Sequence, residues 1–281
     1  MKKNIQFRLL ILFLMIFCNY ILQAQHDSSN YFKPQTHFNK KYIKSYFSDS
    51  KDVVTAPFRW NKKHWITTTA LVGTTVFLIT QDDNIQDFFQ QNRNYYTDNA
   101  SKYFFDPFGK GYYSVPLLGI LYLKGIFKDD VRAETTALNG VKAFVMSGII
   151  ARIIKQLTHR HRPNQDNISD PWNWDGPISD TEYNSFPSGH TVSGFSIAAV
   201  LASSYKDKKW IPVLSYSLAT LNGLARINDN KHWASDVFMG AVLGIAIGKL
   251  VYNNSQKNDK IKIIPSSIKN SVGLSLLIEL H

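Results

Sequence analysis

Residues 155–163 read KQLTHRHRP, residues 187–190 read PSGH, and residues 225–236 read ARINDNKHWASD. Together these clusters supply three cations, two histidines and one carboxylate: Lys155, Arg162, Arg226, His190, His232 and Asp236. Fixed cations hold an anion, and histidines that titrate near neutrality move protons on it. The clusters therefore predict a site for a phosphate-like anion.

The first cluster places two cations seven residues apart. Lys155 and Arg162 are separated by two helical turns, so they share one face if the helix continues to Pro163, which then ends it. The alternative is a basic helix end that only complements the helix macrodipole, and for this cluster alone the alternative is the better interpretation.

The second cluster combines a turn with the start of an apolar helix. Pro187 and Gly189 shape the turn, and backbone N–H groups near Ser188 and Gly189 then point at an anion held at the helix N-terminus. His190 follows, where an imidazole can give a proton to a leaving oxygen. The alternative is an ordinary N-cap at Ser188 with a surface histidine beside it.

The third cluster pairs a histidine with a carboxylate. His232 and Asp236 are four residues apart, which brings them together on one helix face, so that Asp236 holds one ring nitrogen and leaves the other free to attack. Arg226, six residues earlier, adds a planar bidentate donor for phosphate oxygens. The alternative is a His and Asp pair on a helix surface.

The order and spacing of the clusters favour the functional interpretation over these alternatives. The chain matches, with one departure, the signature K-x6-R-P, P-S-G-H and S-R-x5-H-x3-D. In this it resembles the superfamily of type 2 phosphatidic acid phosphatases (PAP2) and vanadium haloperoxidases. The departure is Ala225, where the signature has serine. Because the other motif residues remain, we expect the missing hydroxyl to tune the activity rather than abolish it.

The resemblance implies a metal-independent phosphatase that works through a phosphohistidine. In that scheme His232 attacks phosphorus, Asp236 orients it, and His190 protonates the departing alcohol. No cofactor is implied, because fixed cations neutralise the charge that Mg²⁺ manages elsewhere. The phosphate-binding residues that the resemblance implies are Lys155, Arg162, Ser188, Gly189 and Arg226.

Three other functions stay open at this point. The first is vanadate-dependent halide oxidation, because in this superfamily the phosphate-binding residues, here called the cage, also bind vanadate. The modest length and the apolar helices of this chain are more similar to the lipid phosphatases. A membrane protein with a degenerate site is another, which the completeness of the catalytic set disfavours. The third is a zinc site, whose ligands would be His159, His161, His190 and His232.

Six apolar stretches predict an all-α domain over residues 65–254, a six-helix bundle of the kind that the resemblance implies. They are Trp65–Thr80, Tyr112–Phe127, Ala137–Leu157, Thr191–Tyr205, Trp210–Leu224 and Ser235–Tyr252. We expect the connection over residues 81–111 to be a polar loop. The tail, residues 255–281, has apolar residues in β-type alternation around Pro265, which predicts a small hairpin.

The N-terminus predicts an export signal. Basic residues precede the apolar run Leu9–Phe17, and Ala24 offers a small-residue cleavage point, so residues 1–24 are expected to be removed. The single cysteine, Cys18, lies in this segment. Residues 25–64 are polar and basic. We expect an arm that wraps the domain, and a stretch lying on an anionic membrane surface is the alternative.

Loop charges indicate an orientation for a chain in the inner membrane of a bacterial envelope. Residues 81–111 are rich in Asp and Asn, whereas residues 206–209 and 257–262 are basic. By the positive-inside rule, the three clusters then face the periplasm. A cleaved signal would leave residue 25 outside and reverse every loop. The conflict is removed if the helices do not all span, as in a soluble or surface-seated periplasmic enzyme, or if the N-terminal segment does not translocate the arm. We favour membrane association with a periplasmic site.

The net charge of +11 suits an anionic partner without choosing one. The apolar helices and the resemblance favour a membrane and a phosphorylated lipid, such as phosphatidic acid, an isoprenyl diphosphate or a lipid A phosphate. A soluble location would suit small phosphomonoesters. We expect no nucleic-acid partner, and the oligomeric state is left open. Trp172 and Trp174 either line the entrance or pack against the domain.

Overall fold

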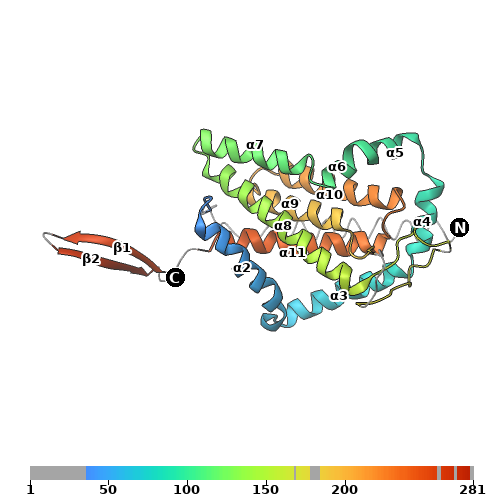
Figure 1. The fold of residues 1–281 in the computed structure, drawn as a ribbon, viewed down its shortest axis with the longest axis horizontal. Helices are drawn as coiled ribbons and strands as arrows, with labels where there is room; N and C mark the ends of the chain where they lie inside the picture. The colour runs from blue at the N-terminus through green and yellow to red at the C-terminus, as the bar shows by residue number, and fades with distance from the viewer. Residues whose placement is uncertain (1–35, 168, 178–183, 258–260, 269–270, 279–281) are drawn as a thin grey trace.

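The computed structural model describes residues 36–167, 169–177, 184–257, 261–268 and 271–278. The predicted export signal, with Cys18, lies outside the described residues, as does the first part of the basic arm. Within the described ranges the chain folds into a helical domain followed by a two-stranded hairpin (Figure 1). The predicted all-α class of the domain is confirmed.

All six predicted apolar helices are present. They are α3 (Lys62–Ile79), α7 (Ser114–Phe127), α8 (Val131–Thr158), α9 (Gly189–Ser204), α10 (Trp210–Asn228) and α11 (Ala234–Ser255). Helix α9 packs against α8, α10 and α11 at once. This central position explains why α9 is buried along most of its length and shows no polar face.

Small residues bring α9 and α11 close together. A Cβ atom added at Gly244 would collide with the carbonyl of Val192, and one added at Gly248 would collide with the carbonyl of Ser196. With Gly240, these glycines repeat every four residues and so lie on one face of α11, which lets the two backbones approach. A larger side chain on this face would push α11, and the third cluster with it, away from α9.

The chain reversals carry the three clusters to one end of the bundle. Helices α8 and α10 run toward that end, and α9 and α11 run away from it (Figure 1). The last turn of α8 holds Lys155, and the first turn of α9 holds His190. Arg226 lies in the last turn of α10, and Asp236 lies in the first turn of α11. Four helix ends therefore meet where the ionisable residues gather.

The connection over residues 81–111, predicted as a loop, is helical. It contains α4 (Asp82–Gln91), α5 (Tyr95–Ala100), the π-helical segment η2 (Ser101–Phe105) and α6 (Asp106–Gly109). Helix capping accounts for the difference. The Asn94 side chain accepts the N–H groups of Tyr96 and Thr97, and two aspartates occupy the first turn of α4. Segments this short carry too little apolar periodicity to be predicted from the pattern.

The described part of the basic arm is also helical. It forms α2 (Lys40–Thr55) and the 3₁₀ segment η1 (Ala56–Arg59). Asn39 caps α2 by accepting the N–H of Tyr42 over 2.9 Å. The side chains of α2 reach both α8 and α11, so this helix is held against the bundle.

At the C-terminal end, β1 (Ile261–Ile268) and β2 (Ser271–Ile278) pair in antiparallel register, with Ile261 opposite Ile278. Two of the described helices, α8 and α11, are long and apolar enough to cross a membrane, and about half of each is buried in the bundle. Core helices of soluble proteins share that length and composition, so these two properties alone do not distinguish a membrane span from a buried core helix.

Candidate active site

The structure brings the predicted site residues together at one end of the bundle. Lys155 Nζ donates to the carbonyl of Ser185 over 3.1 Å and also contacts the carbonyl of Asn184. Arg162 Nη2 donates to that same Asn184 carbonyl over 3.4 Å. A Cβ atom added at Gly189 would lie 3.7 Å from Lys155 Cε. The start of α9 therefore faces Lys155, and Arg162 binds the same carbonyl as that lysine.

Arg162 reaches this place from a loop, so the condition for a shared helix face, a helix that continues to Pro163, is not met. Helix α8 ends at Thr158, and His159 follows with a left-handed φ of 41°. The His159 ring donates from Nδ1 to the carbonyl of Gly176 over 2.7 Å, which holds the chain after the reversal. Tertiary contacts, and not the two-turn spacing, bring Arg162 beside Lys155.

Helix α9 begins at Gly189 with Ser188 at the N-cap position, but the Ser188 side chain accepts no backbone N–H of the first turn, so it is not the ordinary N-cap of the alternative interpretation. The Ser188 N–H donates to the carbonyl of Asp236 over 3.1 Å, and the Ser188 hydroxyl accepts from Thr191 Oγ1 over 2.9 Å. The backbone N–H of Ser188 thus joins the second cluster to the third. The donors that the turn offers to an anion begin with the N–H of Gly189.

His232 and Asp236 form the predicted pair, but not on one helix face. Helix α11 begins at Ala234, so His232 lies before it, and His232 Nδ1 is 3.6 Å from Asp236 Oδ2. The same carboxylate oxygen accepts from Ser185 Oγ over 2.5 Å and from the Trp233 N–H over 3.0 Å. Asp236 is therefore fixed by several donors and presents Oδ2 to Nδ1 of the imidazole.

The surroundings of His232 favour a neutral ring. Burial lowers the pKa of His232 well below its usual range, Asp236 opposes this shift, and the positive charges of Lys155 and Arg162 reinforce it. Because Nδ1 faces the carboxylate, Nε2 is the nitrogen that keeps a lone pair. The geometry can therefore supply an uncharged nucleophile.

Arg160 joins this site although the sequence did not single it out. Its side chain is fully buried, and it donates from Nη1 to Asp236 Oδ1 over 2.5 Å and from Nη2 to Asp82 Oδ2 over 2.8 Å. Asp82 also accepts the N–H of Ser235 over 3.0 Å. Arg160 lies inside the first cluster, and this position is the one feature of the sequence that could have indicated its role in the site. The sequence offered no comparable signal for Asp82.

Asp106 of α6 is a second residue that sequence reasoning missed. Its Oδ1 contacts Arg226 Nη1 and lies 3.4 Å from His190 Nε2, and its Oδ2 lies 2.5 Å from Lys110 Nζ. Burial acts to raise the pKa of Asp106, but the Lys110 hydrogen bond and the Arg226 charge outweigh it, so the pKa is lowered. Asp106 stands 120 residues before Arg226, and no pattern links the two.

His190 is uncharged in this arrangement. Burial and then the charge of Arg226 lower the pKa of His190 to about 3, while Asp106 acts in the opposite direction. Burial is the larger effect, because the His190 side chain is only 23% exposed. A proton donor in this position needs an added negative charge nearby before it holds its proton at neutral pH.

Several buried donors in the cage have no hydrogen-bond partner among the described residues. They are Nε of Arg162, Nε of Arg226 and Nε2 of His190, which faces Asp106 Oδ1 at 3.4 Å without making a hydrogen bond. Buried polar groups are normally paired, because leaving one unpaired costs about 1–3 kcal/mol. Three unpaired nitrogens of one cage therefore point to a ligand that accepts hydrogen bonds. An anion of phosphate type has that property.

The alternative zinc set is not assembled. His159 binds the carbonyl of Gly176, and His161 Nδ1 lies 2.5 Å from Asp166 Oδ2. No group of three or more His, Cys, Asp or Glu residues within the described ranges is placed to hold a metal. The residues gathered at the cage are mainly cations, and these suit an anion rather than a metal ion.

The two tryptophans between the first and second clusters differ. The Arg160 guanidinium lies 4.8 Å from the ring centroid of Trp174, and Trp174 packs on Phe186 with ring centroids 5.3 Å apart. Trp172 is more than half exposed. Trp174 therefore supports the buried arginine, and only Trp172 remains a candidate for the entrance.

Comparison of this sequence with known proteins finds one superfamily profile and several phosphatases. The sequence profile of the PAP2 superfamily matches residues 137–260. The decaprenylphosphoryl-5-phosphoribose phosphatase of Mycobacterium tuberculosis is 34% identical over 132 residues, which are 47% of this chain and 68% of that protein. The lipid A 1-phosphatase of Porphyromonas gingivalis is 44% identical over 73 residues, 26% of this chain and only 16% of that enzyme.

One solved structure has a related fold. It is a transmembrane PAP2-type phosphatidylglycerolphosphate phosphatase from Bacillus subtilis, with a TM-score of 0.52 and 20% sequence identity. The match covers 68% of this chain and 98% of that protein. At this identity the similarity concerns the fold alone, and it agrees with the helical bundle described above.

Proposed function

Because this chain belongs to the PAP2 superfamily, we propose that it is a phosphatase that hydrolyses lipid phosphates at the cage between α8, α9, α10 and α11. One observation carries the proposal: among the described residues, buried nitrogens of Arg162, Arg226 and His190 make no hydrogen bond, and they lie beside the neutral imidazole of His232. Lys155 and the N-terminus of α9 complete a positively charged lining. A phosphate group would satisfy all of these donors.

The reaction proceeds in two displacements. His232 Nε2 attacks phosphorus, the bond from phosphorus to the substrate oxygen breaks, and His190 gives a proton to the departing oxygen. Water then attacks the phosphohistidine, with His190 taking a proton from it, and inorganic phosphate leaves. Asp236 stabilises the His232 ring as it gains positive charge. No metal ion takes part in these steps, because the cations of the cage balance the phosphate charge.

Two observations support a lipid phosphate as the substrate. Relatives with matching segments act on lipid A 1-phosphate and on a decaprenyl phosphoribose phosphate, as their names state. Apolar side chains are exposed along α7, among them Leu117 and Ile120, which suits contact with lipid chains. We therefore favour a phosphate carried on a lipid over a small soluble phosphomonoester.

Helix length and the charges of the connecting segments support a location in the inner membrane with the cage on the periplasmic side. Helices α8 and α11 have the length and composition of spans. The basic turn over residues 206–209 joins α9 to α10 at the end opposite the cage, whereas Asp82, Asp83 and Asp87 of α4 lie toward the cage. Basic segments remain preferentially in the cytoplasm.

A phosphate-release assay tests the activity and the substrate class together. The full chain, purified in detergent, is given phosphatidic acid, an isoprenyl diphosphate, a lipid A phosphate or p-nitrophenyl phosphate, with EDTA and without it. We expect release from at least one lipid substrate, unchanged by EDTA, and none from a His232→Ala preparation. Activity that depends on added Zn²⁺ or Mg²⁺ would refute the mechanism, and a preference for p-nitrophenyl phosphate would refute the lipid assignment.

A further inference from the structure

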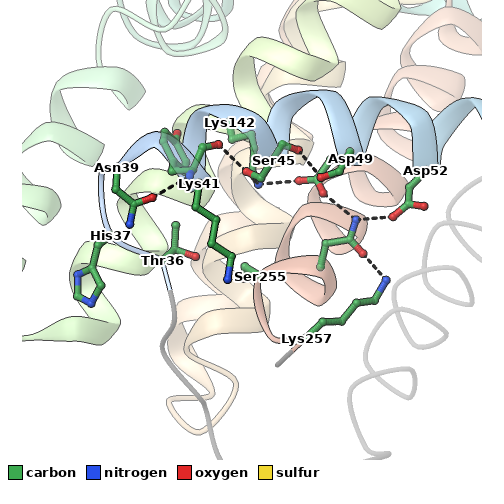
Figure 2. A pocket seen from close by; sticks show the side chains of 13 residues that line it. Thr36, His37, Asn39, Lys41, Ser45, Asp49, Asp52, Lys142, Ser255 and Lys257 are labelled. Atoms are coloured by element: carbon green, nitrogen blue, oxygen red, sulfur yellow. Dashed lines mark hydrogen bonds and ion pairs between the residues drawn. The ribbon is translucent and has the colours of Figure 1, made fainter. Parts of the chain in front are cut away.

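Helix α2 has two different faces. One carries Tyr42, Ser45 and Asp49 and lies against α8 and α11 beside a polar cavity (Figure 2). Asp49 pairs with Lys142 of α8 over 2.6 Å, with both side chains buried, and accepts from Asn254 Nδ2 of α11 over 2.8 Å. These polar contacts fix the rotation of α2 about its axis, so the opposite face must point outward.

The outward face of α2 is apolar. Ile43, Phe47 and Val54 are four and seven residues apart and form one stripe, which Phe58 of η1 continues. Their exposed fractions are 50%, 80%, 72% and 88%. A helix on the surface of a soluble protein has the opposite arrangement, with its apolar side turned inward. The stripe formed by these four residues is therefore uncovered by the described part of the chain and suits an apolar environment.

Lysines run beside this stripe at a constant offset. Lys40, Lys44 and Lys51 each precede a stripe residue by three positions, and all three are exposed. Residues three apart are neighbours on a helix surface, and a lysine stem can lie along apolar surface while its ammonium group reaches polar headgroups. A row of lysines beside an apolar stripe is typical of a helix that lies in the interface of an anionic bilayer.

The chain that leaves α2 continues this surface. Trp60 and Trp65 pack edge to face with ring centroids 5.1 Å apart, and Trp65 is half exposed. Tryptophan is enriched where a membrane meets water. On α3, Ile66 and Phe77 are also exposed. The apolar surface thus passes from α2, past a tryptophan pair, onto a helix that runs along the bundle (Figure 1).

We propose that α2 and η1 form an interfacial anchor that lies on an anionic phospholipid bilayer, at the end of the bundle opposite the phosphate cage. The anchor contacts α11 near its C-terminal end, at Asn254, whereas the cage contains Asp236 from the first turn of that helix. The inference rests on the membrane location in the proposed function. It adds a specific lipid contact made by a segment that lies outside the residues matched by the family profile.

Spin labels on the full chain test the anchor. After Cys18→Ser, a nitroxide is attached at Phe47→Cys on the stripe or, as matched control, at Ser48→Cys, the exposed neighbour outside the stripe. Single proteins are placed in nanodiscs of phosphatidylcholine with one quarter phosphatidylglycerol. We expect the label at position 47 to be accessible to oxygen and shielded from a water-soluble nickel chelate, and the label at 48 to show the reverse. Equal access of the nickel chelate to both labels would overturn the proposal.

Four further measurements separate this inference from its alternatives. Replacing Lys40, Lys44 and Lys51 by glutamine should raise nickel access at position 47 several-fold, and pure phosphatidylcholine should act in the same direction on the unaltered lysines. Dipolar broadening between labels in detergent that persists at low protein density would mean that a second copy covers the stripe, which refutes the lipid anchor. Because the measurement needs no turnover, it is repeated in the His232→Ala background, where failure of the phosphatase assignment cannot affect it.

Discussion

Arg160 Nη1 donates to Asp236 Oδ1 over 2.5 Å, and neither side chain is exposed. The other terminal nitrogen of the same guanidinium donates to Asp82 Oδ2 over 2.8 Å. One planar fork thus ties α4 to the carboxylate that faces His232, which a lysine ammonium could not do with the same geometry. The position of Asp236 depends on this contact.

Removing the Arg160 fork should destabilise the fold. Arg160→Gln leaves two buried carboxylates without their cation, so we expect the free energy of unfolding to fall by about 3–5 kcal/mol. Thermal or chemical unfolding in detergent, followed by circular dichroism, measures the change. The control is Arg93→Gln, because Arg93 pairs with Asp98 at the surface and such pairs contribute at most about 1 kcal/mol. Equal stability of the two variants would contradict the role given to Arg160.

Asp106 should weaken anion binding, because its carboxylate contacts the same Arg226 that the phosphate needs. We expect Asp106→Asn to lower the inhibition constant of inorganic phosphate by roughly tenfold, equivalent to about 1.4 kcal/mol. Asp98→Asn removes a carboxylate that pairs with Arg93 instead and serves as the control. An unchanged inhibition constant in Asp106→Asn would mean that the contact with Arg226 opens without cost.

The sequence predicts the bundle well and the cage in part, for a physical reason. Buried helices need apolar residues along most of their length, so the pattern detects them, and it also detects motif residues close together in the chain. It cannot detect contacts that only tertiary packing creates. Asp106 meets Arg226 from 120 residues away, and Arg162 enters from a loop after α8 ends at Thr158. His232 likewise meets Asp236 from outside the helix on which the spacing placed it.

A serine in place of Ala225 should raise the affinity for phosphate, because the family signature has a hydroxyl at this buried position beside Arg226. We expect Ala225→Ser to tighten phosphate binding about fivefold, the effect of one hydrogen bond of about 1 kcal/mol. Ala225→Cys is the control, because a thiol has similar size and is a weak donor. Product inhibition by phosphate measures both. If serine and cysteine behave alike, the hydroxyl makes no contact with the anion.

The two histidines should differ in their dependence on the leaving group. His232→Ala removes the nucleophile, so we expect no phosphate release from any substrate. His190→Ala removes only the proton donor, and we expect a loss of about 10²–10⁴-fold with alkyl phosphates but a smaller loss with p-nitrophenyl phosphate, whose leaving group needs no proton. Steady-state rates on both substrates test this. A uniform loss across substrates would assign His190 to binding instead.

Anion binding should take up a proton at His190. In the empty cage, burial and Arg226 hold the pKa of His190 at about 3, so the ring is neutral at pH 7. A bound dianion raises that pKa, and linkage then requires the affinity to increase as pH falls below the pKa of the complex, by at most tenfold per pH unit for one proton, until the pKa of the empty cage is reached. Sulfate is the suitable probe, because it does not itself titrate near neutrality. Calorimetric titrations at several pH values, in buffers of different ionisation enthalpy, measure the affinity and the proton uptake. His190→Gln should bind sulfate with an affinity that varies little with pH, and a variant that keeps the wild-type dependence would place the proton elsewhere.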